Sequence, residues 1–530
     1  MKLSEKTFKG TNVPRSTLIT YSISAFFYEA FFEFITLFAI LYVQLASPIT
    51  ATGDPSQYSL MLMVVVFGLV VIKIMTAFFY TMAGHLLEKL VLKIGKYRGF
   101  IIYGSITTSF FFVLLFFVAP LFSGWVYVSL FIIFYILMEL CYAFNDIAFW
   151  AFLNTLTRNE KKRGVISCAV NAFSGAGCYL VASLSPAITA GDAKKNLSVF
   201  ALALVVCYLI CQLILGFVMY ERKEDEITAE EVKILKESNI FSPFKILFSD
   251  GQIFMTIGVF FLLFLAQDCL IANSSNYFYF EYGYGSFTDS GFGNELKSGG
   301  FMSCVFIIVF GIANVSSTIV YPFFAKRFTK KQIMIASGTI VALIYLFMFF
   351  YAFRRGHEIS LFAAAFCLAF FHGMIYSCMF LNCINSSEYY QYKYHARRNG
   401  DIISLKNVAM IMASAIQTGL LYLFLFASGL LSANSSIGSY EALKASGEEI
   451  PDFINAVNQA IIDSSQSYSN DVYLSGITLL PMILTVIAVI ITVRKIKVND
   501  EKNYQLYVED IMEREKALKA EKAQENKISK

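Results

Sequence analysis

Six ionisable residues stand out within the long apolar stretches of this 530-residue chain: Glu29, Glu33, Lys73, Glu139, Asp146 and Asp268. An ionisable group at membrane depth is costly, so each of them is a functional candidate. Glu29 and Glu33 share one helix face, and so do Glu139 and Asp146. Trp150 lies one turn beyond Asp146. A carboxylate accepts hydrogen bonds from neighbouring hydroxyls and an indole packs on an apolar C–H face, which together suit a sugar.

The same residues also have a purely structural explanation. A buried acid can serve a hydrogen bond between two helices, or it can pair with Lys73. Trp150 taken alone is more often a packing residue or an interface anchor than a binding surface. Spacing alone therefore leaves both interpretations open.

The elements that would position these residues are membrane-spanning helices. Hydrophobic residues make up 57% of the chain and charged residues 15%, which excludes an ordinary soluble enzyme. The net charge of +4 also argues against a nucleic-acid partner. A spanning helix needs roughly 20 apolar residues. The predicted spans are 17–46, 59–86, 99–121, 125–153, 165–189, 198–220, 252–280, 300–325, 332–353, 359–386, 402–431 and 471–493.

Basic residues in the connectors predict the orientation, because cytoplasmic loops carry an excess of Lys and Arg. With both termini in the cytoplasm, inside segments hold 35 of the 42 Lys and Arg residues. The outside ones are Lys194, Lys195, Lys297, Arg354, Arg355 and Lys444. We therefore predict an all-α, multi-pass protein of the cell (plasma or inner) membrane, embedded in the lipid bilayer, with both termini cytoplasmic.

The chain is expected to divide into two six-helix bundles, residues 1–220 and 251–495. The charged connector 221–250 separates them and is the longest predicted cytoplasmic loop. The second bundle carries a long outside loop at 432–470, and residues 496–530 form a charged, helix-prone cytoplasmic tail. Two six-helix halves are typical of major facilitator transporters, whose halves rock about a site near the midplane.

One segment is specific enough to suggest a family. Residues 142–163, YAFNDIAFWAFLNTLTRNEKKR, resemble the signature of the glycoside–pentoside–hexuronide:cation symporters. That signature reads Asp-Ile-Pro-Phe-Trp, then Thr-x-Thr and a charged loop, and Ala148 replaces the proline here. Residues 94–104 and 388–407 agree with two further family segments. The resemblance implies the major facilitator fold and secondary transport of sugars or glycosides, coupled to sodium or protons.

The resemblance also implies a solute site. Asp146 matches a sugar-binding aspartate, Trp150 the tryptophan beside it, and Tyr142 a tyrosine that lines the site. Glu29 falls where the first helix carries a second sugar-binding acid. Asn171 falls where the family can carry a sugar-contacting arginine. Because Asn171 removes a charge and several donors, the identity of the solute does not carry over.

The sodium site of the family is dismantled in this sequence. The family has two aspartates one turn apart on the second helix, a polar residue between them, a threonine ligand on the fourth helix and a lysine on the eleventh. The residues at these positions are Thr76, Tyr80, Phe79, Ala143 and Ile411. A sodium site needs several hard oxygen ligands and usually a carboxylate. We therefore expect sodium coupling to be lost.

New charges stand near the lost site. Lys73 precedes Thr76 by one turn, and Glu139 replaces a family glycine on the adjoining helix. We hypothesise that Lys73 pairs with a nearby acid, most simply Glu139, so that its ammonium stands in for sodium. Transport would then be uniport or coupled to a proton on Glu29 or Glu33. Alternatively, Lys73 snorkels toward the cytoplasm.

Other functions stay open at this point. A phenylalanine-rich cavity would also fit a lysolipid or another amphiphile. The lost cation site, the long loop and the tail would suit a transporter-like receptor that moves no solute. ATP-driven transport is not supported, because the chain has no phosphate-binding G-x-x-x-x-G-K-[ST] loop. An enzyme is disfavoured because the chain has no cluster of His, Cys and Asp and its four histidines are scattered, and we expect no cofactor or metal.

Overall fold

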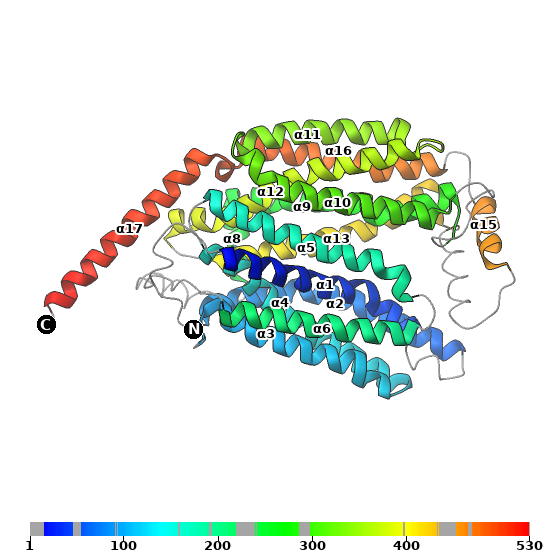
Figure 1. Ribbon diagram of the computed structural model, residues 1–530, viewed down its shortest axis with the longest axis horizontal. Helices are drawn as coiled ribbons and strands as arrows, with labels where there is room; N and C mark the ends of the chain where they lie inside the picture. The colour runs from blue at the N-terminus through cyan, green and yellow to red at the C-terminus, as the bar shows by residue number, and fades with distance from the viewer. Residues whose placement is uncertain are drawn as a thin grey trace.

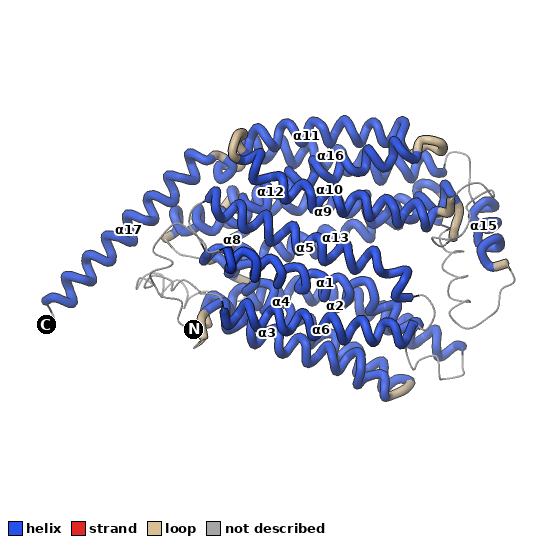
Figure 2. The backbone as a smooth tube through the Cα atoms, viewed as in Figure 1, coloured by secondary structure: helices blue, strands red, loops and turns tan. Residues whose placement is uncertain are grey.

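The computed structural model describes residues 15–45, 55–90, 92, 94–156, 160–189, 193–218, 239, 241–285, 297–395, 398–431, 433, 452–464 and 469–528. Helices account for nearly all of this part of the chain, and no strand forms within it (Figure 2). The predicted all-α class is therefore confirmed for the described residues.

Twelve helices are long and apolar enough to cross a membrane. The first set comprises α1 (Arg15–Leu45), α2 (Pro55–Lys89), α3 (Lys96–Val113), α4 (Gly124–Leu156), α5 (Glu160–Thr189) and α6 (Ala193–Val218). The second set comprises α9 (Gly251–Tyr282), α10 (Gly299–Ala325), α11 (Lys330–Phe347), α12 (Glu358–Tyr394), α13 (Asn399–Ser428) and α16 (Ser469–Lys495). Each predicted span coincides with one of these helices.

Shorter elements complete the described chain. They are α8 (Ser242–Ser249), α15 (Phe453–Ser464), α17 (Glu501–Ile528) and short π or 3₁₀ segments at Leu114–Val118, Ala119–Leu121, Met348–Ala352 and Lys497–Asn499. Residues 221–238 of the predicted central connector lie outside the described residues. So do 432, 434–451 and 465–468 of the predicted outside loop, whose described part contains α15.

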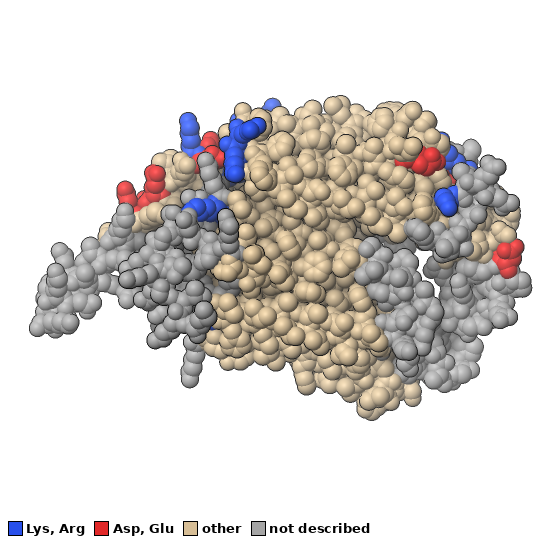
Figure 3. Space-filling model, in the orientation of Figure 1, with Lys and Arg blue, Asp and Glu red and all other residues tan. Residues whose placement is uncertain are grey.

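The surface of the helix bundle is apolar across its middle. Lys, Arg, Asp and Glu side chains gather at the two ends of the visible face, and the zone between them carries none (Figure 3). Large apolar side chains such as Phe67, Leu343 and Phe350 are exposed on the long helices. An apolar surface of this extent needs a lipid environment. The chain is therefore a multi-pass membrane protein.

The two sets lie side by side along their length (Figure 1). Within the first set α1 packs on α5 and α3 on α4, and within the second α9 packs on α16 and α10 on α12. Between the sets, α2 contacts α13 and α5 contacts α10. We call the end at which α1 begins and α16 ends the terminal end, and the opposite end, where α15 lies, the distal end (Figure 1).

The tail is helical, as predicted, and one face of its first turns is buried. Tyr504 and Tyr507 of α17 are buried. The Tyr507 ring lies 5.5 Å from the Tyr389 ring and 4.7 Å from the Tyr392 ring, both on α12. The tail therefore packs on the second set before it extends away from the terminal end (Figure 1).

Asp250 fixes the start of α9 at the terminal end. Its Oδ1 accepts hydrogen bonds from the backbone amides of Gln252 and Ile253, the arrangement of a helix N-cap. Its Oδ2 accepts from Lys393 Nζ at 2.7 Å and from the Tyr394 hydroxyl at 3.0 Å. Burial of the carboxyl group opposes ionisation, but these donors outweigh it and hold the pKa of Asp250 below its ordinary value.

Close packing of α1 against α5 depends on Gly177. A methyl group at this position would lie 2.1 Å from the carbonyl oxygen of Phe26, so the Gly177→Ala variant must push two helices apart. Overpacking costs about 1–3 kcal/mol or more, and we expect a lower midpoint of thermal unfolding in detergent. Gly258→Ala on α9, with no atom within 4 Å of the added methyl, is the matched control. Equal midpoints for the two variants would contradict this account of the packing.

Candidate functional site

One face of α4 carries Tyr142, Asp146 and Trp150, and it lies where the two sets meet. Asp146 is 6% exposed. Its carboxylate accepts hydrogen bonds from the Tyr28 hydroxyl on α1 and from the Asn407 side-chain amide on α13. Asp146 thus contacts both sets at once, and the four-residue spacing along α4 brings Tyr142 and Trp150 to the same region.

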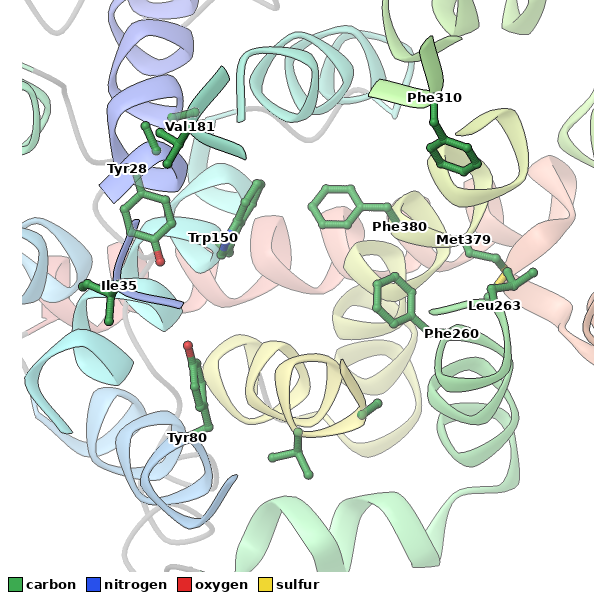
Figure 4. Packing of buried hydrophobic residues seen from close by; sticks show 14 of the residues in the cluster. Tyr28, Ile35, Tyr80, Trp150, Val181, Phe260, Leu263, Phe310, Met379 and Phe380 are labelled. Carbon is green, nitrogen blue, oxygen red and sulfur yellow. The ribbon is translucent and has the colours of Figure 1, made fainter. Parts of the chain in front are cut away.

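Aromatic residues surround this carboxylate. The Tyr80 hydroxyl on α2 and the Trp150 indole lie beside Asp146. The Tyr28 and Tyr80 hydroxyls point toward one another from opposite sides of the site (Figure 4). Tyr142 stacks against Tyr28, with ring centroids 5.3 Å apart, and against Phe32 at 4.9 Å. Asp146 therefore sits among phenol and indole donors that can pass their hydrogen bonds to an incoming solute.

Trp150 reaches across to the second set. Its ring meets the Phe380 ring of α12 edge to face, with centroids 5.4 Å apart. The Lys406 ammonium of α13 lies 5.1 Å from the Trp150 ring centroid. In this structure the indole is therefore covered by residues of the second set, and a solute that uses its face must take the place of one of them.

Lys406 is a residue that the sequence interpretation missed. It is 3% exposed and lies within α13. The prediction of orientation instead counts Lys406 among the Lys and Arg residues of the cytoplasmic segments. The expected helix 11 lysine position, Ile411, lies five residues further along the same helix. The signal was available, because Lys406 lies inside the predicted span 402–431.

Glu29 lies on α1 beside α5, the helix that also carries Asn171. A carboxylate oxygen of Glu29 accepts a hydrogen bond from the Ser174 hydroxyl at 3.0 Å. Asn171 is part-exposed and precedes Ser174 by three residues on the same helix. Glu33 follows Glu29 by one turn, and Cys178 lies beside it. The structure thus joins Glu29 to α5 through Ser174, with Glu33 one turn further toward the distal end.

Lys73 and Glu139 lie near each other without direct contact. Among the described residues no ion pair joins them, although the Lys73 charge acts on both Glu139 and Glu33. The Lys73 side chain is exposed, and its Nζ lies 5.9 Å from the Phe32 ring centroid. Glu139 is buried, and its Oε2 lies 3.5 Å from the Thr76 hydroxyl.

The residues at the positions where the sequence predicts a degenerate cation site are buried between α2 and α4. Thr76 donates a hydrogen bond to the carbonyl of Ile72 in its own helix at 2.8 Å. Phe79 and Ala143 are buried and bring no side-chain oxygen. Tyr80 brings one hydroxyl, which lies beside Asp146. The oxygen donors at the family positions are thus two hydroxyls without a carboxylate.

A second group of polar residues closes the terminal end. Arg163, in the first turn of α5, is fully buried. Its guanidinium donates to Glu388 on α12 through two hydrogen bonds of 2.8 Å, and to Asn385 at 2.9 Å. The Tyr504 hydroxyl of α17 contacts both Arg163 and Glu388. We call these four residues the terminal latch, because they tie the first set to the second set and to the tail.

The helices α2 and α13 also approach closely at this end. A methyl group on Gly84 would lie 2.7 Å from the Ser404 Cβ atom and 2.9 Å from the Gly400 carbonyl oxygen. Glycine is therefore required for the backbones to meet here. Together with the terminal latch, this contact joins the two sets on the terminal side of Asp146.

Comparison with known proteins places the chain among transporters. A sequence model described as MFS/sugar transport protein matches residues 17–500. The raffinose carrier protein of Pediococcus pentosaceus is 23% identical over 423 residues, which cover 78% of this chain and 62% of that protein. The lactose permease of Leuconostoc lactis is 19% identical over 527 residues, covering 97% of this chain and 74% of that protein. The match thus spans about six tenths of the raffinose carrier.

Solved structures share the fold. A proton:xylose symporter of the major facilitator superfamily (MFS), bound to 6-bromo-6-deoxy-D-glucose, has a TM-score of 0.57 at 12% identity, with 93% of this chain and 97% of that chain covered. The fucose:proton symporter of E. coli has a TM-score of 0.52 at 12% identity, with 88% and 98% covered. At these identities the likeness concerns the fold.

Proposed function

Because this chain belongs to the MFS/sugar transport protein family, we propose that it carries a sugar or glycoside across a membrane by alternating access. The family predicted from residues 142–163 is thereby confirmed, and it is a family of transporters rather than enzymes. One observation carries the proposal: the buried Asp146 carboxylate accepts hydrogen bonds from both sets of helices at the place where they meet.

The proposed solute site consists of Glu29, Tyr142, Asp146, Trp150 and Asn171. The two carboxylates would accept hydrogen bonds from solute hydroxyls, and Asn171 would both donate and accept. The Trp150 indole would pack on the apolar face of a sugar ring. Such groups replace the hydration that a polar solute loses in the membrane, while leaving it free to depart on the other side.

Alternating access requires the two halves, residues 1–220 and 251–495, to rock against each other. We propose that both termini are cytoplasmic, so that the terminal latch closes the cytoplasmic side. In this scheme the latch holds during solute entry from the outside and breaks when the site opens inward. The excess of Lys and Arg in the segments at the terminal end supports this orientation, and the cell membrane is the proposed location.

We propose that transport does not require sodium. Thr76, Phe79, Tyr80 and Ala143 offer too few oxygen ligands for a sodium ion. If transport is active, the proposed coupling ion is a proton bound to Glu29 or Glu33. If transport is not coupled to an ion, the protein is a uniporter. The acids within the membrane then need compensation, and Lys73 is the basic residue whose charge acts on Glu33 and Glu139.

Replacement of Lys73 tests its part in this charge balance. In the Lys73→Ala variant, Glu33 and Glu139 lose their compensating charge, so we expect sodium-free uptake to fall several-fold and its pH optimum to move toward acid. Lys245→Ala, on the exposed side of α8, is the matched control. If transport, its pH dependence and thermal stability are all unchanged in Lys73→Ala, Lys73 does not compensate the charges of Glu33 and Glu139.

Uptake into proteoliposomes tests the function itself. A labelled panel of glycosides, pentosides and hexuronides is supplied with no gradient, with a sodium gradient and with a proton gradient. Saturable uptake of one member that is indifferent to sodium is the expected result. Strong sodium dependence would overturn the account of the cation site. No uptake of any sugar would favour an amphiphile such as a lysolipid, or a receptor that moves no solute.

A further inference from the structure

The Lys406 ammonium is surrounded by aromatic rings, and no carboxylate of the described residues forms an ion pair with it. Its ammonium lies over three aromatic rings, 5.1 Å from the centroid of Trp150, 5.4 Å from Phe380 and 5.8 Å from Phe260. A desolvated cation–π contact stabilises an ammonium group. The desolvation cost of a buried charge is larger than this stabilisation. The aromatic rings therefore offset only part of the cost, and an anionic group has to offset the rest.

Two carboxylates of the first set act on this ammonium. They are Asp146 on α4 and Glu29 on α1, and the thiol of Cys383 on α12 also faces it. Within the part of the chain that the structure describes, Lys406 makes no hydrogen bond or ion pair. Asn407, the next residue, binds Asp146 and so fixes the register of α13 against α4 at this point.

We propose that the Lys406 ammonium is the built-in cation of the central site, balancing Asp146 and Glu29 and donating a hydrogen bond to the bound solute. The proposal rests on the proposed transport function and deepens it. A solute hydroxyl that enters between the ammonium and the carboxylates would bridge them. Because Lys406 belongs to the second set and both carboxylates to the first, their attraction acts across the interface that must open and close.

This role differs from that of Lys73. Lys73 acts on Glu33 and Glu139, all within the first set, so its field does not change when the two sets move as rigid bodies. Lys406 acts on Asp146 and Glu29 across the interface. The two ammonium groups thus act on two different pairs of acids, and of the two it is Lys406 that links charge balance to the movement of the halves.

Charge removal at Lys406 is the direct test in proteoliposomes. Lys406→Met keeps the length and apolar stem of the side chain, and we expect sodium-free uptake at neutral pH to fall about tenfold. Addition of sodium or lithium, or a shift to acid pH, should then raise uptake by this variant several-fold. The reason is that Asp146 and Glu29 must take a cation or a proton from solution. Lys406→Arg keeps the charge and should gain no such response, and Lys245→Met controls for the loss of a lysine elsewhere.

Two results would overturn the proposal. One is Lys406→Met uptake that matches the unmodified protein, and the other is lost uptake that no cation or pH restores.

A double-mutant cycle based on thermal unfolding measures the coupling between Lys406 and Asp146 in the absence of solute. Lys406→Met and Asp146→Asn are each expected to lower the unfolding midpoint in detergent, and the double variant to lose less than the sum of the two. Strictly additive shifts contradict the pairing. If Lys406→Met does not fold, the double variant with Asp146→Asn is expected to fold. If neither Lys406→Met nor the double variant folds, the proposal is contradicted. Since no solute is present, this result is independent of whether the sugar panel succeeds.

Discussion

Asp146→Asn is expected to reduce saturable sugar uptake by at least about 100-fold. The substitution keeps the size of the side chain but removes the charge that strengthens its hydrogen bonds. A hydrogen bond to a charged group is worth about 1.5–3 kcal/mol, and the loss of two such bonds to solute hydroxyls, about 3 kcal/mol in all, is a factor of more than 100. Initial rates of uptake across a range of solute concentrations provide the measurement.

A matched substitution separates the site from general effects. Asp463→Asn makes the same chemical change on the exposed face of α15 and should leave uptake unaltered. Size-exclusion profiles of both variants show whether they fold. If folded Asp146→Asn protein transports within about twofold of the unmodified protein, the solute site lies elsewhere, and the role of the α4 face in transport is wrong.

The membrane-spanning helices could be predicted from the sequence because hydropathy depends on local composition. Each of the twelve spans is a continuous apolar stretch, and each forms one helix. The α4 face could be predicted because Asp146 and Trp150 are four residues apart, which a helix converts into proximity. Neither inference needs knowledge of which helices touch.

What could not be predicted depends on contacts between distant segments. Nothing in the sequence around Arg163 indicates that it meets Glu388, 225 residues away. Lys406 follows a basic loop closely in the sequence, so it is easily counted as one of the basic residues on the cytoplasmic side. Its burial results from the packing of α13 against α4, α9 and α12, which a count of basic residues does not contain. The Lys73–Glu139 pair is the converse case, since adjacency on neighbouring helices suggested a contact that the structure does not form.

The terminal latch gives the second large effect. In Arg163→Met, Glu388 loses its bidentate guanidinium partner at the terminal end and keeps the neutral Tyr504 hydroxyl as a donor. Breaking a buried ion pair costs about 3–5 kcal/mol. Most of that cost falls on the state in which the terminal end is closed, because Glu388 regains water when the end opens. We therefore expect the population to shift by more than about 100-fold toward states open at the terminal end.

Cysteine labelling reads this shift directly. Cys168 on α5 and Cys383 on α12 are buried near the terminal end, so a water-soluble maleimide should label them slowly in the unmodified protein. In Arg163→Met both should react faster, and uptake should fall because the site no longer faces the distal side. Arg327→Met, an exposed arginine at the same end, should change neither quantity. Labelling of Cys168 and Cys383 as slow in Arg163→Met as in Arg327→Met would mean that the latch does not control closure, and that the close approach of α2 and α13 at Gly84 suffices to hold this end shut.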